Sequence, residues 1–317
     1  MNQALSLIGK RLLLALLTLL LVSAVVFFIS SLLPGDAAQE ILGQSATPEQ
    51  IAALRHDMGL DQPSYLRYSQ WLGGWVSGDM GQSITANMPV GEVIADRLPN
   101  SLLLAGLTAA VAIPLALLIG IASAIWRGGR LDRSLSVGTL SMVAVPEFLV
   151  ATILVLIFAV KLRWLPSLTL VPEDATMGEF LRAYAMPVLT LCFVVMAQMV
   201  RMTRAALIDQ LAQPYAEMAK LKGVGPVRLV FAHALPNALG PIANAVAFSA
   251  SYLLGGAVIV ETIFNYPGIA SLMVNAVTSR DMPLLQACAM IFCAAYLLLV
   301  LIADICAILA NPRLRAG

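Results

Sequence analysis

Residues 12–33 form one unbroken run of 22 uncharged, mostly apolar positions directly after Lys10 and Arg11. A helix needs about 20 such residues to cross the hydrocarbon core of a bilayer. A secretory signal peptide has a shorter apolar core of about 7–15 residues. The segment that follows, Pro-Gly-Asp at 34–36, also lacks a convincing small-residue cleavage pattern. The run therefore predicts a first transmembrane helix rather than a signal peptide.

The rest of the chain has the same character, since 60% of the 317 residues are hydrophobic and only 12% are charged. A soluble domain has roughly 25% charged residues, so lipid must be the main solvent of this chain. The apolar stretches predict six spans, at 12–33, 101–126, 134–160, 184–207, 238–262 and 284–309. We therefore expect an all-α membrane protein with six transmembrane helices.

A polar segment, residues 34–100, separates the first two spans and holds eight acidic and three basic side chains. Residues 47–49 (Thr-Pro-Glu) are typical of the N-cap and first turn of a helix, which Gly59 is expected to end. A second amphipathic stretch covers 64–78. The segment is therefore predicted to be a small helical insert.

Charged side chains divide unevenly between the two sides that six spans imply. With the N-terminus inside, twelve Lys and Arg fall in inner segments and seven in outer ones, whereas three acidic residues fall inside and twelve outside. Cytoplasmic loops of membrane proteins carry an excess of Lys and Arg. The pattern predicts that both termini, including the tail at 311–317, are cytoplasmic and that the 34–100 insert is extracytoplasmic.

Several classes of site are not expected. A net charge of +1 gives no basic surface for nucleic acid. The four cysteines lie in apolar runs without a CxxC pair, and His56 is far from His233 in sequence, so we expect no metal site. The chain has no GxxxxGK[ST] phosphate loop, so we expect no bound cofactor and no ATP hydrolysis. It also lacks HExxH, a Ser–His pair and paired aspartates, which argues against an intramembrane hydrolase.

The inner loop at 210–237 is polar and predicts a compact cytoplasmic structure. Pro214 suits the first position of a short helix, Gly223 the left-handed residue that ends it, and Gly225 with Pro226 the start of a second short helix. A first helix of about nine residues rises only about 13 Å and cannot span a membrane. Two interpretations fit these residues: a docking site for a soluble partner, or an ordinary re-entry loop.

This loop resembles the EAA loop of binding-protein-dependent ABC importer permeases. The residues that match at the family's spacing are Glu217, Ala219, Gly223, Leu235 and Pro236. Two positions depart from the family pattern, because Met218 stands for an alanine and His233 for an isoleucine. These departures concern the affinity for a partner or its choice rather than the identity of the loop.

Nearly all of the chain is similar to the dipeptide, oligopeptide and nickel permease family, in the subunit type with a large outer insert. The matching motifs are LPGD (33–36), MGLDQP (58–63), GDMGQS (78–83), RLPNSLLLA (97–105), ETIFNYPGIASL (261–272), RDMPLLQA (280–287) and NPRLR (311–315).

The resemblance implies a subunit of a type I importer in the cytoplasmic (inner) membrane of a bacterium or archaeon. Residues 101–310 would form the five-helix permease core. A second permease chain, usually a different one, completes the path, two ATPase subunits hold ATP and Mg, and an external substrate-binding protein delivers the cargo. The helix near Pro214 would be the coupling helix that enters the ATPase. Small peptides are the implied cargo, with nickel complexes, glutathione, peptide antibiotics and oligosaccharides as alternatives.

Three acidic residues lie in or beside apolar runs, where ionisable groups are costly and indicate functional candidates. Glu147 follows Pro146 near the middle of the third span, where it either faces the pore and attracts a cationic group or pairs across a subunit interface. Glu261 is expected at a gate or in a structural pairing, and Asp304 in a structural contact with water or Arg313. The alternative function is an ion-coupled secondary transporter that uses Glu147 as a proton relay.

Overall fold

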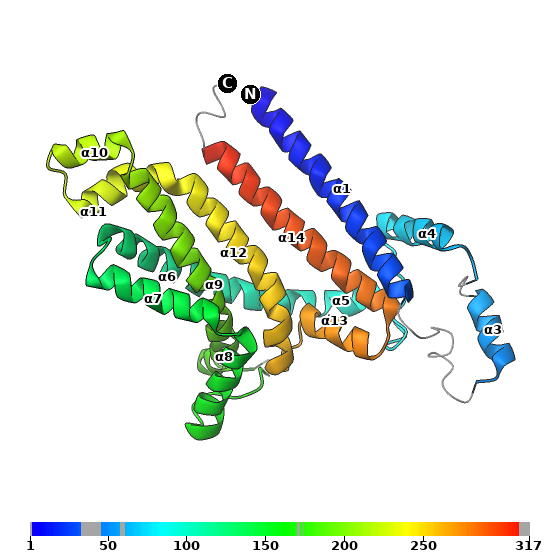
Figure 1. The fold of residues 1–317 in the computed structure, drawn as a ribbon. Coiled ribbons are helices and arrows are strands. Elements are labelled where there is room, and N and C mark those ends of the chain that lie inside the picture. Colours follow the sequence, from blue (N-terminus) through cyan, green and yellow to red (C-terminus); the bar gives the residue numbers. More distant parts are fainter. Residues whose placement is uncertain (1, 33–45, 58–60, 170–171, 173, 311–317) are drawn as a thin grey trace. The chain divides into compact units, whose positions relative to one another are not determined.

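The computed structural model describes every residue except 1, 33–45, 58–60, 170–171, 173 and 311–317. The described residues form helices, and they contain no strand beyond one isolated bridge between Gln82 and Pro89. The helices are α1 (Asn2–Leu32), α3 (Pro48–Asp57), α4 (Ser64–Ser77), α5 (Val90–Ala95), α6 (Leu98–Ile125), α7 (Arg130–Ala144), α8 (Glu147–Leu154), η1 (Val155–Lys161), α9 (Met177–Leu211), α10 (Pro214–Leu221), α11 (Pro226–Leu229), η2 (Val230–Ala234), α12 (Leu235–Ile263), α13 (Ile269–Thr278) and α14 (Met282–Ala310) (Figure 1). The expected all-α fold is confirmed. The LPGD motif at 33–36, Gly59 and the tail at 311–317 lie outside the described residues.

Five helical segments within the described residues are long and apolar enough to cross a bilayer. They are Ser6–Ser30, Val90–Ile125, Met177–Leu211, Pro226–Ile263 and Met282–Ile305. The count rises to six if the bent pair Arg130–Ala144 and Glu147–Lys161 is one span.

The third predicted span, 134–160, is broken rather than continuous. Its two halves meet at 98°, and the bend between α7 and α8 is visible in Figure 1. Pro146 explains the break, because it has no backbone N–H and disfavours helical backbone at the residue before it. Val145 is accordingly extended, with φ −91° and ψ 123°. Glu147 therefore begins a new helix instead of lying in the middle of one.

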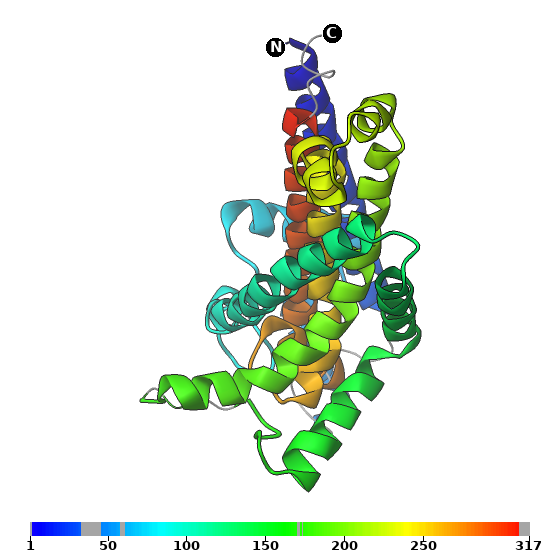
Figure 2. The same ribbon diagram turned by 90° about the vertical axis from the view of Figure 1, so that its left-hand side faces the viewer.

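The helices group into two compact units. The first contains Leu102–Tyr266 together with Met1–Leu13 and Leu298–Gly317, and the second contains Leu14–Ser101 and Pro267–Leu297. In the first unit α9 is the central helix and packs against α7, α8, α10 and α12. Figures 1 and 2 show α10 and α11 at one end of α9 and α8 toward the other end.

The predicted helices of the 34–100 insert are present where they are described. At the start of α3, Gln50 N–H donates to Thr47 Oγ1 (3.3 Å) and Thr47 N–H donates to Gln50 Oε1 (3.0 Å). This reciprocal pair is a capping box and confirms Thr47 as the N-cap. The amphipathic stretch at 64–78 is α4, which ends at Gly78 with φ 88°.

A buried carboxylate fixes one turn of the second unit. Asp281 is fully buried before α14, and its Oδ2 accepts hydrogen bonds from Ser83 Oγ (2.5 Å), Thr85 Oγ1 (2.8 Å) and Thr85 N–H (3.1 Å). Leu284 N–H donates to Oδ1 (3.2 Å). Burial opposes ionisation of this carboxyl, but the hydrogen bonds from Ser83, Thr85 and Leu284 outweigh burial and lower the pKa of Asp281. The ionised Asp281 therefore holds residues 83–85 against the start of α14.

Candidate functional site

The short helix α10 forms where the proline and glycine residues of the loop predict it. Pro214 occupies its first turn, and Gly223 after its end has φ 82°. Gly223 N–H donates to Lys220 O (2.9 Å) and Val224 N–H donates to Ala219 O (3.2 Å). These two bonds are the Schellman pattern, which requires a left-handed residue at the position of Gly223. The predicted helix, turn, helix unit is confirmed, with α11 following from Pro226.

The two faces of α10 differ in burial. Ala216 and Ala219 are buried and pack with Leu229 of α11, with Leu211 and Val224 at the edge of this cluster. On the other face Glu217 is exposed, as are Met218 (55%) and Leu221 (82%). The small alanines thus let α10 lie close to its neighbours, while an acidic and two large apolar side chains project outward.

The EAA-like residues do not form one cluster. Glu217 is exposed, Ala219 is buried under α10, and Gly223 makes the turn. Leu235 and Pro236 lie beyond α11 and η2, where they begin α12. These residues therefore mark the path of the chain from the exposed helix α10 back into the spanning helix α12.

A second buried cluster supports the end of α9 that leads to α10. Its buried members are Ala124, Ala206, Leu207, Val230, Ala234, Ala238 and Ile242. They come from α6, α9, η2 and α12, with Leu235 packed against them. Leu211, the last residue of α9, contacts both this cluster and the cluster under α10. Buried packing is therefore continuous from α10 to α6, α9 and α12 within the first unit.

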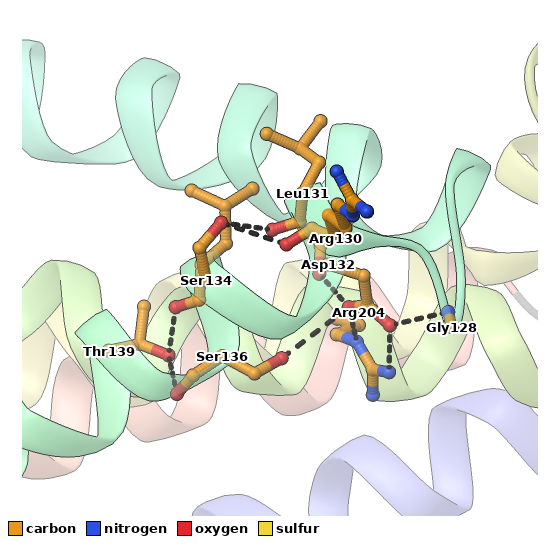
Figure 3. A network of polar contacts seen from close by, with 10 residues as sticks. Gly128, Arg130, Leu131, Asp132, Ser134, Ser136, Thr139 and Arg204 are labelled. Atoms are coloured by element: carbon orange, nitrogen blue, oxygen red, sulfur yellow. Dashed lines mark hydrogen bonds and ion pairs between the residues drawn. The ribbon is translucent and has the colours of Figure 1, made fainter.

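Beside this end of α9 lies an ion pair that sequence reasoning missed (Figure 3). Arg204 Nε donates to Asp132 Oδ1 (2.7 Å) and Arg204 Nη2 donates to Asp132 Oδ2 (2.8 Å). Gly128 N–H also donates to Oδ2 (2.8 Å), and the hydroxyls of Ser123 and Ser136 donate to Oδ1. The Asp132 side chain is only 6% exposed. The one sequence signal was that Asp132 is an isolated acid among arginines in an inner loop.

Glu147 is the first residue of α8, and its carboxylate lies against α12. Its Oε1 atom is buried, and no described residue donates a hydrogen bond to it. A Cβ atom at Gly256 of α12 would be 2.7 Å from this oxygen, so the carboxylate takes this position because residue 256 has no side chain. The side chain as a whole is half-buried. Glu147 is therefore an acidic group placed between two helices with one oxygen enclosed.

The other two acids lie in different surroundings. Glu261 is fully buried in α12, near a buried cluster that contains Val260, Phe264 and Tyr266. Tyr266 N–H donates to Glu261 O (2.8 Å), and the hydroxyls of Tyr266 and Tyr184 lie 3.2 Å apart. Glu261 is thus part of the interior of the first unit.

Asp304 forms an ion pair that the sequence did not predict. Its Oδ2 lies 3.2 Å from Arg11 Nη1, which joins α14 to α1 near both ends of the chain. The expected alternative partner, Arg313, lies outside the described residues. The described part of the chain contains no group of three or more His, Cys, Asp or Glu side chains that could hold a metal ion.

Comparison with known sequences identifies the family. Residues 116–316 match the family described as binding-protein-dependent transport system inner membrane component, and residues 4–105 match the N-terminal part of such membrane components. The chain belongs to this family. It is a multi-pass inner-membrane permease subunit of a binding-protein-dependent ABC importer, and it is not the catalytic subunit. The family and function predicted from the EAA-like loop are confirmed.

Similar permeases align with nearly all of this chain. A putative peptide transport system permease protein of Brucella abortus is 34% identical over 311 residues, which cover 98% of this chain and 99% of that protein. The glutathione transport system permease protein GsiC of Escherichia coli K12 is 35% identical over 306 residues, which cover 96% and 97% of the two chains. The similarity therefore extends over nearly all of the residues of each pair of proteins.

Proposed function

We propose that this permease is driven through α10 by partner ATPase subunits. The observation that carries the proposal is the division of α10 into a buried face, with Ala216 and Ala219, and an exposed face, with Glu217, Met218 and Leu221. An exposed apolar surface rimmed by charge is typical of a protein docking site. Because the Schellman turn at Gly223 fixes the direction of α10, a partner that binds it can push on a rigid element.

The mechanism follows from the position of α10 in the chain. α9 ends at Leu211 and α10 begins at Pro214, so only two residues separate the proposed docking helix from the central helix of the first unit. The ATPase subunits, not this chain, supply the residues for ATP and Mg. When nucleotide closes them, α10 is displaced and α9 moves with it. The result is a rigid-body switch between two states that ATP biases.

We propose the following assembly around this subunit. A second permease chain, usually a different one, completes the path. Two ATPase subunits bind the α10 side of the pair, and an extracytoplasmic substrate-binding protein delivers the cargo. The family description, which specifies dependence on a binding protein, supports the last of these partners.

Small peptides are the proposed cargo. The names of the relatives in Brucella abortus and Escherichia coli support this class, since one refers to peptides and the other to glutathione. Glutathione is itself a modified tripeptide. Nickel complexes, peptide antibiotics and oligosaccharides are the alternatives that a transport assay must distinguish.

We also propose that both termini are cytoplasmic and that residues 34–100 are extracytoplasmic. The excess of Lys and Arg in the inner loops supports this orientation. The Arg11–Asp304 ion pair supports placing both termini on the same side of the membrane, because it joins the N-terminal part of α1 to the C-terminal part of α14. A reporter protein that is active only in the cytoplasm should be active when it is fused to either terminus. Activity of a reporter that works only in the periplasm, fused to either terminus, would contradict this orientation.

The test of the whole proposal is transport by the assembled complex. Both permeases and the ATPase subunits are reconstituted in liposomes, with the binding protein outside, and uptake of labelled di- and tripeptides is measured against unlabelled competitors. We expect uptake to require enclosed ATP and to stop with a non-hydrolysable analogue. Uptake that persists without the ATPase subunits and follows pH or membrane potential would instead support the proton-relay alternative at Glu147.

A further inference from the structure

The Asp132–Arg204 pair adds a fixed polar connection between α7 and α9, two helices that also pack against each other. Asp132 lies in the first turn of α7, and Arg204 lies seven residues before the end of α9. The guanidinium makes two hydrogen bonds to the carboxylate, at 2.7 and 2.8 Å. A two-bond arginine–carboxylate pair fixes orientation as well as distance. The start of α7 is therefore held to the end of α9 that leads to α10.

Two other groups also donate hydrogen bonds to the Asp132 carboxylate and hold it in place. Gly128 N–H and the Ser123 hydroxyl donate to it from the end of α6 and the turn that follows. Asp132 consequently connects α6, the 126–129 turn, α7 and α9 at one point (Figure 3). A buried carboxylate satisfied by several donors resists rearrangement, since each lost bond leaves a buried polar group unpaired.

Close packing adds to this connection. A Cβ atom at Gly120 of α6 would lie 2.8 Å from Thr203 Cβ and 3.1 Å from Val200 O of α9. The two helix backbones therefore approach each other within one turn of Arg204. Because the contact involves the backbone of α9, α6 cannot shift along α9 without breaking it.

Beyond α7 the chain reaches Glu147. Val145 is extended and α8 begins at Glu147, so α7 ends at the bend that directs this carboxylate against Gly256. Any movement of α7 therefore also moves the bend between α7 and α8, and Glu147 with it.

We propose that Asp132 and Arg204 are a positioning pair that makes α7 follow α10, so that displacement of α10 by the ATPase reaches the α7–α8 hinge and Glu147. The inference rests on the proposed coupling role of α10. The pair lies outside α10, the helix proposed to bind the ATPase subunits. It acts by converting movement at one end of α9 into movement of the broken span.

The test measures cargo transported per ATP hydrolysed in the reconstituted complex. Asp132→Asn and Arg204→Gln are compared singly and together, and copurification of the ATPase subunits reports assembly. We expect each single variant to assemble and to hydrolyse ATP while transport per ATP falls roughly tenfold, a size of coupling loss expected along such connections. The double variant should lose no more than either single variant, because residues that act as one unit are not additive.

Milder variants and matched controls complete the design. Arg204→Lys keeps the charge but loses the two-bond geometry, so its loss should lie between wild type and Arg204→Gln. Arg130→Gln removes an exposed arginine from the same turn of α7, and Ser134→Ala removes a hydroxyl that bonds only carbonyls of its own helix. Both controls should keep the wild-type ratio of transport to hydrolysis.

Three results would overturn the positioning role of Asp132 and Arg204. The positioning role is overturned if Asp132→Asn and Arg204→Gln leave the ratio of transport to ATP hydrolysis unchanged. It is also overturned if neither Asp132→Asn nor Arg204→Lys assembles with the ATPase subunits. A loss that multiplies in the double variant also overturns it. Failure of the coupling role of α10 is recognised separately, by wild-type coupling when the turn at Gly223 is altered. If that turn matters and the ion pair does not, only the inference about Asp132 and Arg204 is wrong.

Discussion

The Glu147 carboxylate occupies space on α12 that exists because residue 256 has no side chain. A Cβ atom at Gly256 would lie 2.7 Å from Glu147 Oε1 and 3.3 Å from its carboxyl carbon. The contact joins α8, which begins at the break after Pro146, to a continuous spanning helix. Glu147 Oε1 is thus enclosed by helix packing, although the Glu147 side chain as a whole is only half-buried.

Gly256→Ala should displace the Glu147 carboxylate without unfolding the permease. The added methyl meets the far end of a flexible side chain, so a change of rotamer costing about 1 kcal/mol can relieve the overlap. We expect transport to change while the melting temperature of the purified complex stays close to wild type. Gly255→Ala is the matched control, because no atom lies within 4 Å of a Cβ there. Equal transport by both variants would show that the placement of Glu147 is unimportant.

Glu147→Gln distinguishes a pore role from an interface role. The amide keeps the size of the side chain and removes its charge. If the group attracts a cationic part of the cargo, uptake of cationic peptides should fall about fivefold more than uptake of neutral ones, corresponding to about 1 kcal/mol. If the group pairs across the interface with the second permease, both cargoes should fall equally and the two permeases should copurify less well. Competition assays with peptides of matched length measure the difference.

The sequence predicted those features whose cause lies within a few neighbouring residues. Long apolar runs define the spans because a helix satisfies its backbone groups internally. Pro214 and Gly223 define α10 because each favours one backbone conformation. Pro146 explains where the third predicted span breaks, but a proline does not determine the angle of 98°, which depends on packing against α9 and α12.

The pairings between distant residues were not predictable in this way. Charge counting placed Asp132 and Arg204 on the same side of the membrane, yet the two are 72 residues apart, and nothing local to either selects the other. Asp304 was expected near Arg313 because that residue is close in sequence, whereas the described partner is Arg11 at the opposite end of the chain. Such pairs are determined by the way helices pack.

Asp281→Asn should loosen the turn at residues 83–85. The amide removes an ionised acceptor from buried donors, which costs on the order of 1–3 kcal/mol. Because the folded-state pKa of Asp281 is lowered, its contribution is present above the unfolded pKa of about 3.9 and is lost as pH falls through the lower folded value. The protection of these amides, which is their exchange rate relative to the intrinsic rate at the same pH, should therefore be high in the wild type at neutral pH and lower in very acid solution. The variant should exchange faster already at neutral pH.

Asp96 provides a matched control for Asp281. Asp96→Asn removes an exposed carboxylate from the same unit and should leave exchange unchanged. Equal exchange in wild type and Asp281→Asn at neutral pH would show that the neutral hydroxyl contacts alone hold the turn.

Gly223→Ala tests the turn after α10, because the substitution strains the backbone at residue 223 without adding a steric overlap. Nothing lies within 4 Å of a Cβ at Gly223, so the added methyl meets no neighbour, but its φ of 82° is left-handed and costs an L residue about 1–2 kcal/mol. Gly225→Ala is a close control, because it also has no atom within 4 Å and its φ is −65°. We expect Gly223→Ala to weaken ATPase copurification or peptide-stimulated hydrolysis, and Gly223→Val to weaken it further. Gly225→Ala should behave as wild type. Since the two glycines differ in backbone conformation and not in surrounding space, wild-type uptake and hydrolysis in Gly223→Val would remove α10 as the coupling helix.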